Sequence, residues 1–316
     1  MGRCGRPPDP ARRPGTACRG GHRPGGGAVF LLPFENPTIP GHLVIKAVNL
    51  DLGYGDRLVL KDVNFEITRG EFVGCLGPNG SGKSTLLSAL CGLVEPQRGA
   101  VLLEEEAIGA LPGRQRARRL AVVPQTTEVR FPFTCFEVVL MGRYPHRRPW
   151  RRLGETDLRA ALEAMAQTST IAFRERVVTA VSGGERQRVV VARALAQTPE
   201  IVLLDEATSS LDVRKKLEIF EVLRELNESL GVTVICAMHD LNLAALYCRR
   251  LMFLKDGRLL RDGPTDQVFT SATLRLVYET DMEVMWHPLH LRPYAVMLPL
   301  SSRLPNRMDG TQGVSP

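Results

Sequence analysis

The sequence predicts an α/β fold, in which helices cover both faces of a mostly parallel sheet, with an antiparallel β-subdomain and an inserted helical subdomain. Three observations lead to this prediction. Short runs of almost continuously apolar residues alternate with helical patterns, as strands buried on both faces require. Near residue 50 apolar and polar residues alternate instead, as in half-buried strands. Between Gln125 and Ser182 there is no strand pattern.

The alternating segments predict the antiparallel β-subdomain. Val48, Leu50 and Leu52 are separated by the polar residues Asn49 and Asp51. A second segment repeats the alternation at Val63, Phe65 and Ile67. Two such segments close together in the chain are expected to pair as antiparallel strands.

Four apolar runs predict the parallel sheet: Phe72 to Leu76, Leu120 to Val123, Ile201 to Leu204 and Val232 to Ala237. Lys215 to Leu230 fits a crossover helix, because its apolar residues fall on one stripe and Gly231 follows as a stop signal. Leu158 to Ala166 is expected to be helical, within an inserted subdomain of residues 126–181. Asp256-Gly257 and Asp262-Gly263 are expected to mark tight turns between short strands.

Three segments are expected along the chain. Residues 1–42 are rich in Arg, Gly and Pro without periodicity, which predicts a disordered extension. Residues 43–298 are expected to form one domain, and residues 299–316 a flexible tail. Because no Met lies between the first residue and Met141, we hypothesise that translation begins at a non-Met codon near Leu43.

Charge and cysteine content limit the class of protein. Of the net charge of +7, residues 1–42 supply +4, through six Arg against Asp9 and Glu35, so the rest of the chain is only mildly basic. This distribution weakens the case for a nucleic-acid or membrane-surface partner that the net charge alone would suggest. The seven Cys lack metal-ligand spacing, and three lie within apolar runs, as reduced core thiols do: Cys75, Cys91 and Cys236. No apolar run is long enough to cross a bilayer.

A glycine-rich loop follows the first apolar run and fits the pattern G-x-x-x-x-G-K-[ST]. It consists of Gly77, Pro78, Asn79, Gly80, Ser81, Gly82, Lys83, Ser84 and Thr85. Between a strand and a helix, the N–H groups of such a loop surround phosphate oxygens. Lys83 is then expected to reach the β- and γ-phosphates, and Ser84 to bind Mg²⁺. The alternative is a glycine-rich turn with a solvated lysine.

Two carboxylates, Asp205 and Glu206, follow the apolar run that begins at Ile201. Open α/β sheets bind their ligands at this end of the strands. We expect Asp205 to hold Mg²⁺ through water and Glu206 to orient or deprotonate the attacking water. Taken alone, the pair would also fit a solvated turn.

Together with these motifs, the chain resembles the ABC ATPase family from about residue 43 to residue 298. Val181-Ser182-Gly183-Gly184-Glu185 is similar to the family's signature motif, with Val181 for the usual Leu and Glu185 for the common Gln. The resemblance implies that the serine and glycines of this motif bind the γ-phosphate held by the opposite subunit. As local structure, Ser182 followed by Glu185 predicts a capped helix start.

Further residues are similar to other elements of the family. Gln125 corresponds to the residue that senses Mg²⁺ and the attacking water, and His239 to the switch histidine that contacts the γ-phosphate. The segment Ser209-Ser210-Leu211-Asp212 is similar to the family's segment that crosses the dimer interface. Tyr54 fits the aromatic residue that stacks on adenine, a contact of roughly 1–3 kcal/mol, although a hairpin tyrosine would look the same.

The resemblance implies a P-loop NTPase core of ABC ATPase type, with ATP and Mg²⁺ as cofactors. Two copies would enclose two ATP head to tail, so that each site combines one phosphate loop with the other copy's signature motif. The family also implies a transmembrane permease and a periplasmic or extracellular substrate-binding protein as partners, and no nucleic acid. The expected location is peripheral, on the cytoplasmic face of the cell membrane.

One segment of the expected helical subdomain indicates the cargo. Gly142-Arg143-Tyr144-Pro145-His146 is similar to a segment of ATPases that serve iron-siderophore, haem and vitamin B12 importers. The basic residues that follow are expected to form a solvated face, or to lie against anionic lipid or the membrane partner: Arg147, Arg148, Arg151 and Arg152.

The interpretations that compete with metal-chelate import are an ABC ATPase for another cargo, a soluble ABC ATPase acting on ribosomes or DNA, and a nucleotide-binding regulator without turnover. ABC ATPases of ribosomes usually carry two motif sets and those of DNA repair a long coiled coil, whereas this chain has one set and no heptads. A regulator without turnover is disfavoured because Glu206 and His239 are both present. A metal site at His287 and His290 is disfavoured because no Cys or carboxylate stands at ligand spacing.

Overall fold

The computed structural model describes Met1 and residues 42–55, 57–125, 131–147, 153–208 and 211–299. The predictions for the N-terminal extension and for the tail therefore lie almost wholly outside the described residues. The same holds for the predictions at Ser209, Ser210, Arg148, Arg151 and Arg152. Within the described part of the chain, no helix is both long enough and apolar enough to cross a membrane.

The predicted β-subdomain is an antiparallel sheet with one packed face. Its strands are β1 (Leu43–Tyr54), β2 (Arg57–Thr68), β4 (Arg98–Leu103) and β5 (Glu106–Ala107), in the order β2-β1-β4-β5. Leu50 and Leu52 of β1 and Val63 of β2 are fully buried, whereas Asn49 is exposed. The alternation in the sequence thus corresponds to inward and outward side chains.

The main sheet has six strands in the order β10-β9-β3-β8-β7-β6. They are β3 (Phe72–Leu76), β6 (Leu120–Val123), β7 (Ile201–Asp205), β8 (Thr233–Ala237), β9 (Arg250–Lys255) and β10 (Arg258–Pro264). Neighbouring strands are parallel except β9 and β10. The four apolar runs are therefore confirmed as parallel strands.

The continuous apolar character of these strands reflects two separate cores. In β7, Val202 and Leu204 join a cluster with the helices α5 (Gly183–Ala196) and α6 (Val213–Leu230). Ile201 and Leu203 point to the opposite face and join a cluster with α1 (Lys83–Leu90) and the β-subdomain. The predicted crossover helix is confirmed as α6, which ends at Gly231 with a left-handed φ of 66°.

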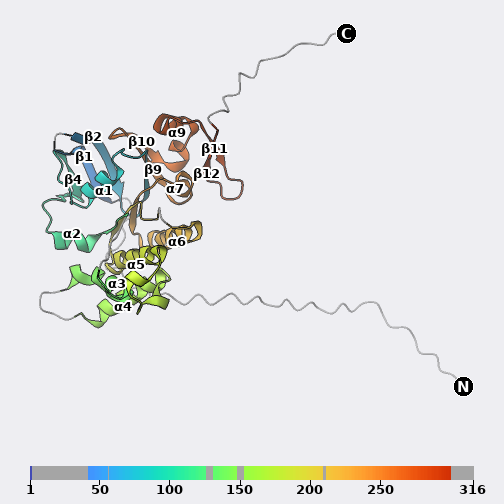
Figure 1. The fold of residues 1–316 in the computed structure, drawn as a ribbon. Coiled ribbons are helices and arrows are strands. Elements are labelled where there is room, and N and C mark those ends of the chain that lie inside the picture. Colours follow the sequence, from blue (N-terminus) through green and yellow to red (C-terminus); the bar gives the residue numbers. More distant parts are fainter. Residues whose placement is uncertain (2–41, 56, 126–130, 148–152, 209–210, 300–316) are drawn as a thin grey trace, which may run out of the picture. The chain divides into compact units, whose positions relative to one another are not determined.

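Helical elements make up the described part of the insertion, apart from one isolated bridge between Thr134 and Val177. They are α3 (Cys135–Leu140), η1 (Met141–His146), α4 (Glu155–Gln167), η2 (Ile171–Phe173) and η3 (Val178–Ala180). Helices α3 and α4 pack on each other and on α5 (Figure 1). At Gly142, η1 approaches α5 so closely that a Cβ would lie 2.1 Å from the carbonyl oxygen of Arg193.

One of the two predicted C-terminal turns is confirmed and the other is wrong. Asp256 and Gly257 join β9 to β10 with φ values of 50° and 77°. Asp262 and Gly263 instead lie within β10. There β10 stays paired with β9, with Asp262 opposite Met252 and Gly263 opposite Leu251, and both oxygens of Asp262 accept hydrogen bonds from the Arg250 guanidinium, at 2.7 Å each. The Asp262 side chain is therefore bound to the neighbouring strand and does not form a local turn.

The C-terminal elements beyond β10 were not predicted. They are α8 (Thr265–Val268), α9 (Ser271–Tyr278) and a hairpin of β11 (Met282–Trp286) and β12 (Pro293–Met297). The hairpin is joined to α7 (Leu241–Tyr247) by the Asn242 side chain, whose Oδ1 accepts from the Ala295 amide at 2.7 Å and whose Nδ2 donates to the Ala295 carbonyl at 3.2 Å. His287 and His290 lie in the loop of this hairpin. In the described residues no cluster of His, Cys, Asp or Glu could hold a metal ion.

The contact at Gly142 yields a test of how the helical insertion is held. Gly142→Ala is expected to lower the free energy of unfolding by about 1–3 kcal/mol, because the added methyl group overpacks the contact with α5. Gly109→Ala is the matched control, since no atom lies within 4 Å of the position of its Cβ. Denaturant unfolding of the two variants would measure the difference, and equal stabilities would contradict the assigned packing.

Candidate nucleotide-binding site

The glycine-rich loop connects β3 to α1, as predicted, and Lys83 is the first residue of that helix. Its side chain is only 4% exposed, and Nζ donates to the carbonyl oxygens of Gly77 (2.9 Å) and Pro78 (3.2 Å). Burial lowers the pKa of Lys83, while the carboxylates of Glu206 and Asp205 act to raise it. The Oγ of Ser81 is buried without a hydrogen-bond partner in the described structure. An unpaired buried hydroxyl in this loop fits a phosphate oxygen as its missing partner.

Two glycines of the loop are required by close approach and by a left-handed backbone. Gly77 has a φ of 156°, and a Cβ there would lie 2.1 Å from the Leu254 carbonyl oxygen of β9. Gly82 has a φ of 104°, and a Cβ there would lie 2.4 Å from Leu60 of β2. The loop is therefore held between the main sheet and the β-subdomain, and a larger residue would displace it.

The two carboxylates at the end of β7 have different surroundings. An oxygen of Asp205 accepts a hydrogen bond from the Ser84 hydroxyl at 2.8 Å. Burial raises the pKa of Asp205, and the neighbouring Glu206 adds to the rise, while the bond from Ser84 counteracts it. A hydroxyl and a carboxylate are hard oxygen ligands that suit Mg²⁺, so Ser84 and Asp205 fit the predicted metal role.

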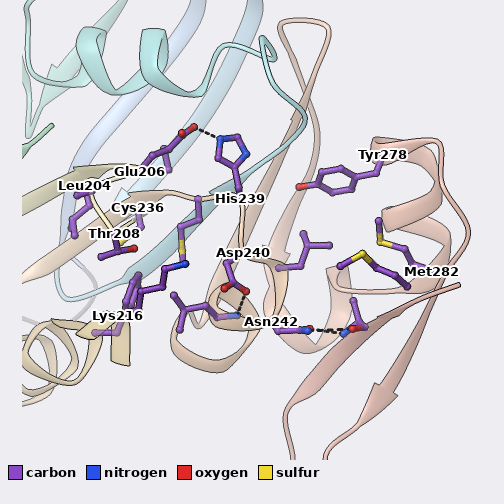
Figure 2. A pocket seen from close by; sticks show the side chains of 18 residues that line it. Leu204, Glu206, Thr208, Lys216, Cys236, His239, Asp240, Asn242, Tyr278 and Met282 are labelled. Carbon is purple, nitrogen blue, oxygen red and sulfur yellow. Dashed lines mark hydrogen bonds and ion pairs between the residues drawn. The ribbon is translucent and has the colours of Figure 1, made fainter. Parts of the chain in front are cut away.

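Glu206 is the centre of the polar contacts in the site. Its backbone is left-handed, with a φ of 47°, and its amide donates to the Ala237 carbonyl at 3.0 Å. The side chain is 11% exposed; Oε2 accepts from Gln125 Nε2 at 3.1 Å, and Oε1 lies 3.9 Å from Lys83 Nζ. Oε1 also pairs with His239 Nε2 (Figure 2). A strained non-glycine backbone held by these contacts is typical of a functional residue.

Four predicted residues thus converge on one pocket from the carboxyl ends of neighbouring strands. Lys83, Gln125, Glu206 and His239 follow β3, β6, β7 and β8. They line a pocket of about 720 Å³ together with Asn79, Gly80, Gly82, Ser84, Thr85 and Val59. Val59 of β2 was missed, because nothing distinguishes it in sequence from other strand residues. The pocket has room for a nucleotide phosphate chain, with an ammonium group and a carboxylate at its floor.

Other predicted site residues lie outside this pocket. Ser182 begins α5 in a capping box: its amide donates to Glu185 Oε2 (2.8 Å), and the Glu185 amide donates to Ser182 Oγ (3.3 Å). The predicted helix cap is confirmed. Asp212 caps α6 through the Lys215 amide at 2.9 Å, and Tyr54 at the end of β1 is 59% exposed. Neither these residues nor Gly183 and Gly184 line the pocket that contains Lys83.

The fold and the site define a phosphate-loop protein built to bind a nucleoside triphosphate. Comparison with known proteins narrows this class. Residues 60–209 match the family described as "ABC transporter". The chain is 38% identical to the iron(3+)-hydroxamate import ATP-binding protein of Bacillus subtilis, over 77% of this chain and 91% of that protein. The chain belongs to the ABC transporter family, among its ATP-binding subunits.

Other relatives have different cargoes in their names. A hemin import ATP-binding protein of Gloeobacter violaceus is 42% identical over 78% of this chain and 90% of that protein. A cobalamin import ATP-binding protein of Halobacterium salinarum is 43% identical over 78% of this chain. The chain spans 61% of the length of this last relative.

Solved structures share the fold. A metal-chelate type ABC transporter in an inward-facing conformation has a TM-score of 0.71 and 26% identity, covering 82% of this chain and 98% of its own. A dimeric bacterial ABC transporter cassette has a TM-score of 0.64 and 34% identity, covering 70% and 98%. The predicted fold class is confirmed.

The raised pKa of Asp205 yields a test of the site's electrostatics. A carboxyl whose pKa is higher in the folded state than in the unfolded chain makes folding less favourable as the pH rises through the folded value. Asp205→Asn is therefore expected to raise the thermal midpoint of the nucleotide-free protein at pH 7. This gain in thermal midpoint should shrink as the pH falls toward 3.8, the ordinary pKa of an Asp side chain.

Melting curves of wild type and Asp205→Asn at several pH values would measure this effect. Asp266→Asn, at an exposed position of α8, is the control and should leave the midpoint unchanged. A lower midpoint for Asp205→Asn at pH 7 would contradict the assigned cost of burying this carboxylate.

Proposed function

We propose that this chain is the ATP-binding and ATP-hydrolysing subunit of an ABC importer that drives uptake of a metal chelate through a separate permease. The observation that carries the proposal is the convergence of Lys83, Gln125, Glu206 and His239 on one pocket. Only the phosphate loop is needed to bind a nucleotide. The carboxylate with its histidine and glutamine partners indicates hydrolysis as well.

In the proposed reaction, water attacks the γ-phosphate and each side chain has a separate task. Lys83 would neutralise charge on the β- and γ-phosphate oxygens, and Ser84 and Asp205 would hold Mg²⁺, which would supply further charge neutralisation. Glu206 orients the water and accepts its proton. His239 and Gln125 contact the two oxygens of Glu206, and in the proposed reaction they would follow the γ-phosphate and the water.

A second copy of the chain is proposed to complete each site. Ser182, Gly183 and Gly184 form the start of a 14-residue helix, where backbone amides favour an anion, yet they do not line their own chain's pocket. In a head-to-tail pair, the start of α5 would face the γ-phosphate held by the other copy. The similarity to a dimeric cassette supports this arrangement.

We further propose that the permease docks in a groove between the helical insertion and the main sheet. The groove has a volume of about 430 Å³, and its wall includes Leu93, Tyr144 and Arg193. Leu93 and Tyr144 are each 75% exposed, although both are large and apolar or aromatic. A short amphipathic helix of the permease would cover these side chains. This position implies a peripheral location on the cytoplasmic face of the membrane.

The cargo is proposed from the relatives, with an iron-siderophore first and haem or cobalamin as alternatives. The segment Gly142 to His146 has a structural task in this chain. Arg143 is 9% exposed, donates to the Ala196 carbonyl (2.8 Å) and pairs with Asp157 (3.0 Å), and His146 Nε2 lies 2.9 Å from the Gln197 carbonyl. These contacts attach η1 to the end of α5 and would not touch a cargo. A substrate-binding protein remains part of the proposal as the cargo's carrier.

The catalytic part of the proposal is tested by Glu206→Gln. The substitution is expected to lower the ATP hydrolysis rate about 10²- to 10⁴-fold, because it removes the base, while ATP binding persists. In cells that lack the native gene, it should also fail to restore uptake of iron-loaded hydroxamate, haem or cobalamin, whichever the wild type restores. Glu283→Gln, on the exposed side of β11, is the matched control. Copurification with ribosomes and normal uptake of all three chelates in the deletion strain would contradict the transport function.

The shared site is tested by mixing two inactive variants. Lys83→Ala removes the lysine contact with the phosphates that a copy makes in its own pocket. Ser182→Ala removes the serine that a copy is proposed to add to its partner's pocket. If each site combines both copies, the mixture should recover up to about a quarter of the wild-type hydrolysis rate, because half of randomly formed dimers would hold one intact site of two. No recovery in mixtures that form dimers, as measured by light scattering, would contradict the head-to-tail arrangement.

A further inference from the structure

A second cavity lies on the other side of the catalytic side chains. It has a volume of about 540 Å³ and is lined by residues of α6, α7, β8 and the C-terminal elements α9, β11 and β12. Figure 2 shows Glu206 and His239 on one side of the cavity and Tyr278 and Met282 on the other. Apart from Glu206 and His239, its lining differs from that of the nucleotide pocket. This size is in the range that encloses a small organic molecule.

Most of the wall is apolar. Its main apolar residues are Phe220, Cys236, Met238, Leu243, Met282 and Ala295. The thioethers of Met238 and Met282 are flexible and polarisable, and such groups favour contact with aromatic rings. The wall therefore suits a flat apolar molecule better than a sugar or a peptide.

One hydroxyl on the wall lacks a partner. The OH of Tyr278 is buried and makes no hydrogen bond of normal geometry in the described structure, although it lies beside the Gly77 backbone. In Figure 2 it points toward the side on which His239 lies. Burial raises the pKa of Tyr278, so the group stays protonated at neutral pH and can donate. A ligand with one acceptor atom would satisfy it.

The charged groups on the wall do not favour a charged ligand. Glu206 and His239 pair with each other, and Asp240 accepts from the Leu243 amide at 3.0 Å as the cap of α7. Lys216, on α6, adds one positive charge to the wall. Because both signs are represented, neither an anion nor a cation is selected.

We propose that this cavity is a binding site for an uncharged, planar aromatic molecule with one hydrogen-bond acceptor. The aromatic body lies against the two methionines, and the acceptor takes the Tyr278 hydroxyl. In this position the molecule touches the segment that carries His239 and the hairpin that Asn242 joins to it. The proposal does not rest on the cargo or on the permease.

The test uses the full chain and Prodan, an uncharged naphthalene dye with one ketone oxygen whose emission shifts to the blue in apolar surroundings. Saturable binding with a blue shift is expected, both with and without Mg-ATP. Ala295→Phe fills the cavity while leaving the backbone bonds between residue 295 and Asn242 in place, and it should abolish the binding. Tyr278→Phe removes only the hydroxyl and should weaken binding about 5- to 10-fold.

The control is Met285→Ser, which removes an apolar side chain that is 48% exposed on the hairpin and does not line the cavity. It should bind Prodan as the wild type does. Thermal melting of each variant checks that it is folded. The proposal is overturned if folded Ala295→Phe retains the binding, if Met285→Ser loses it, if Tyr278→Phe binds unchanged, or if Mg-ATP displaces the dye.

Discussion

The site depends on a buried ammonium group that faces two adjacent carboxylates. Lys83 is enclosed by the carbonyl groups of its own loop, and its Nζ lies 3.9 Å from Glu206. Burial works against the charge of each group, lowering the pKa of Lys83 and raising that of Asp205. Their mutual attraction offsets part of this cost. A core chosen for stability alone would have no charged groups at these positions. The presence of these charges fits a role in binding an anion.

The fold supplies the rigidity that this arrangement needs. The functional side chains follow β3, β6, β7 and β8, which are adjacent in one parallel sheet with both faces buried. From the β-subdomain, Leu60 lies so close to Gly82 that a Cβ at this position would be 2.4 Å from its side chain, so the packing here favours glycine. The left-handed backbone at Glu206 is held by its bond to Ala237 of the neighbouring strand. The strain at this residue is therefore supported by the neighbouring strand β8.

The parts of the site that sequence could predict are those encoded locally. The phosphate loop is a continuous motif, and Gln125, Glu206 and His239 each follow a strand whose apolar run is unmistakable. The parallel sheet then brings the strand ends together without further information. Asp262-Gly263 was mistaken for a turn because its ion pair with Arg250 joins residues on different strands. The C-terminal hairpin was missed because β11 leaves Met285 and Trp286 exposed and β12 leaves Met297 exposed, so that no burial pattern marks the two strands.

Helix α5 links the two surfaces that a transport ATPase would need to couple. At its N-terminus Ser182 is fixed by the capping box, and near its C-terminus Arg193 and Gln197 line the groove beside Tyr144. The 14 residues between these ends span about 20 Å as a helix. Arg143 and His146 bond to the Ala196 and Gln197 carbonyls at the C-terminal end of α5, so η1 is attached to the end of this helix that lies away from Ser182. The segment that resembles a cargo signature thus has a structural contact in this chain, with the C-terminal end of α5.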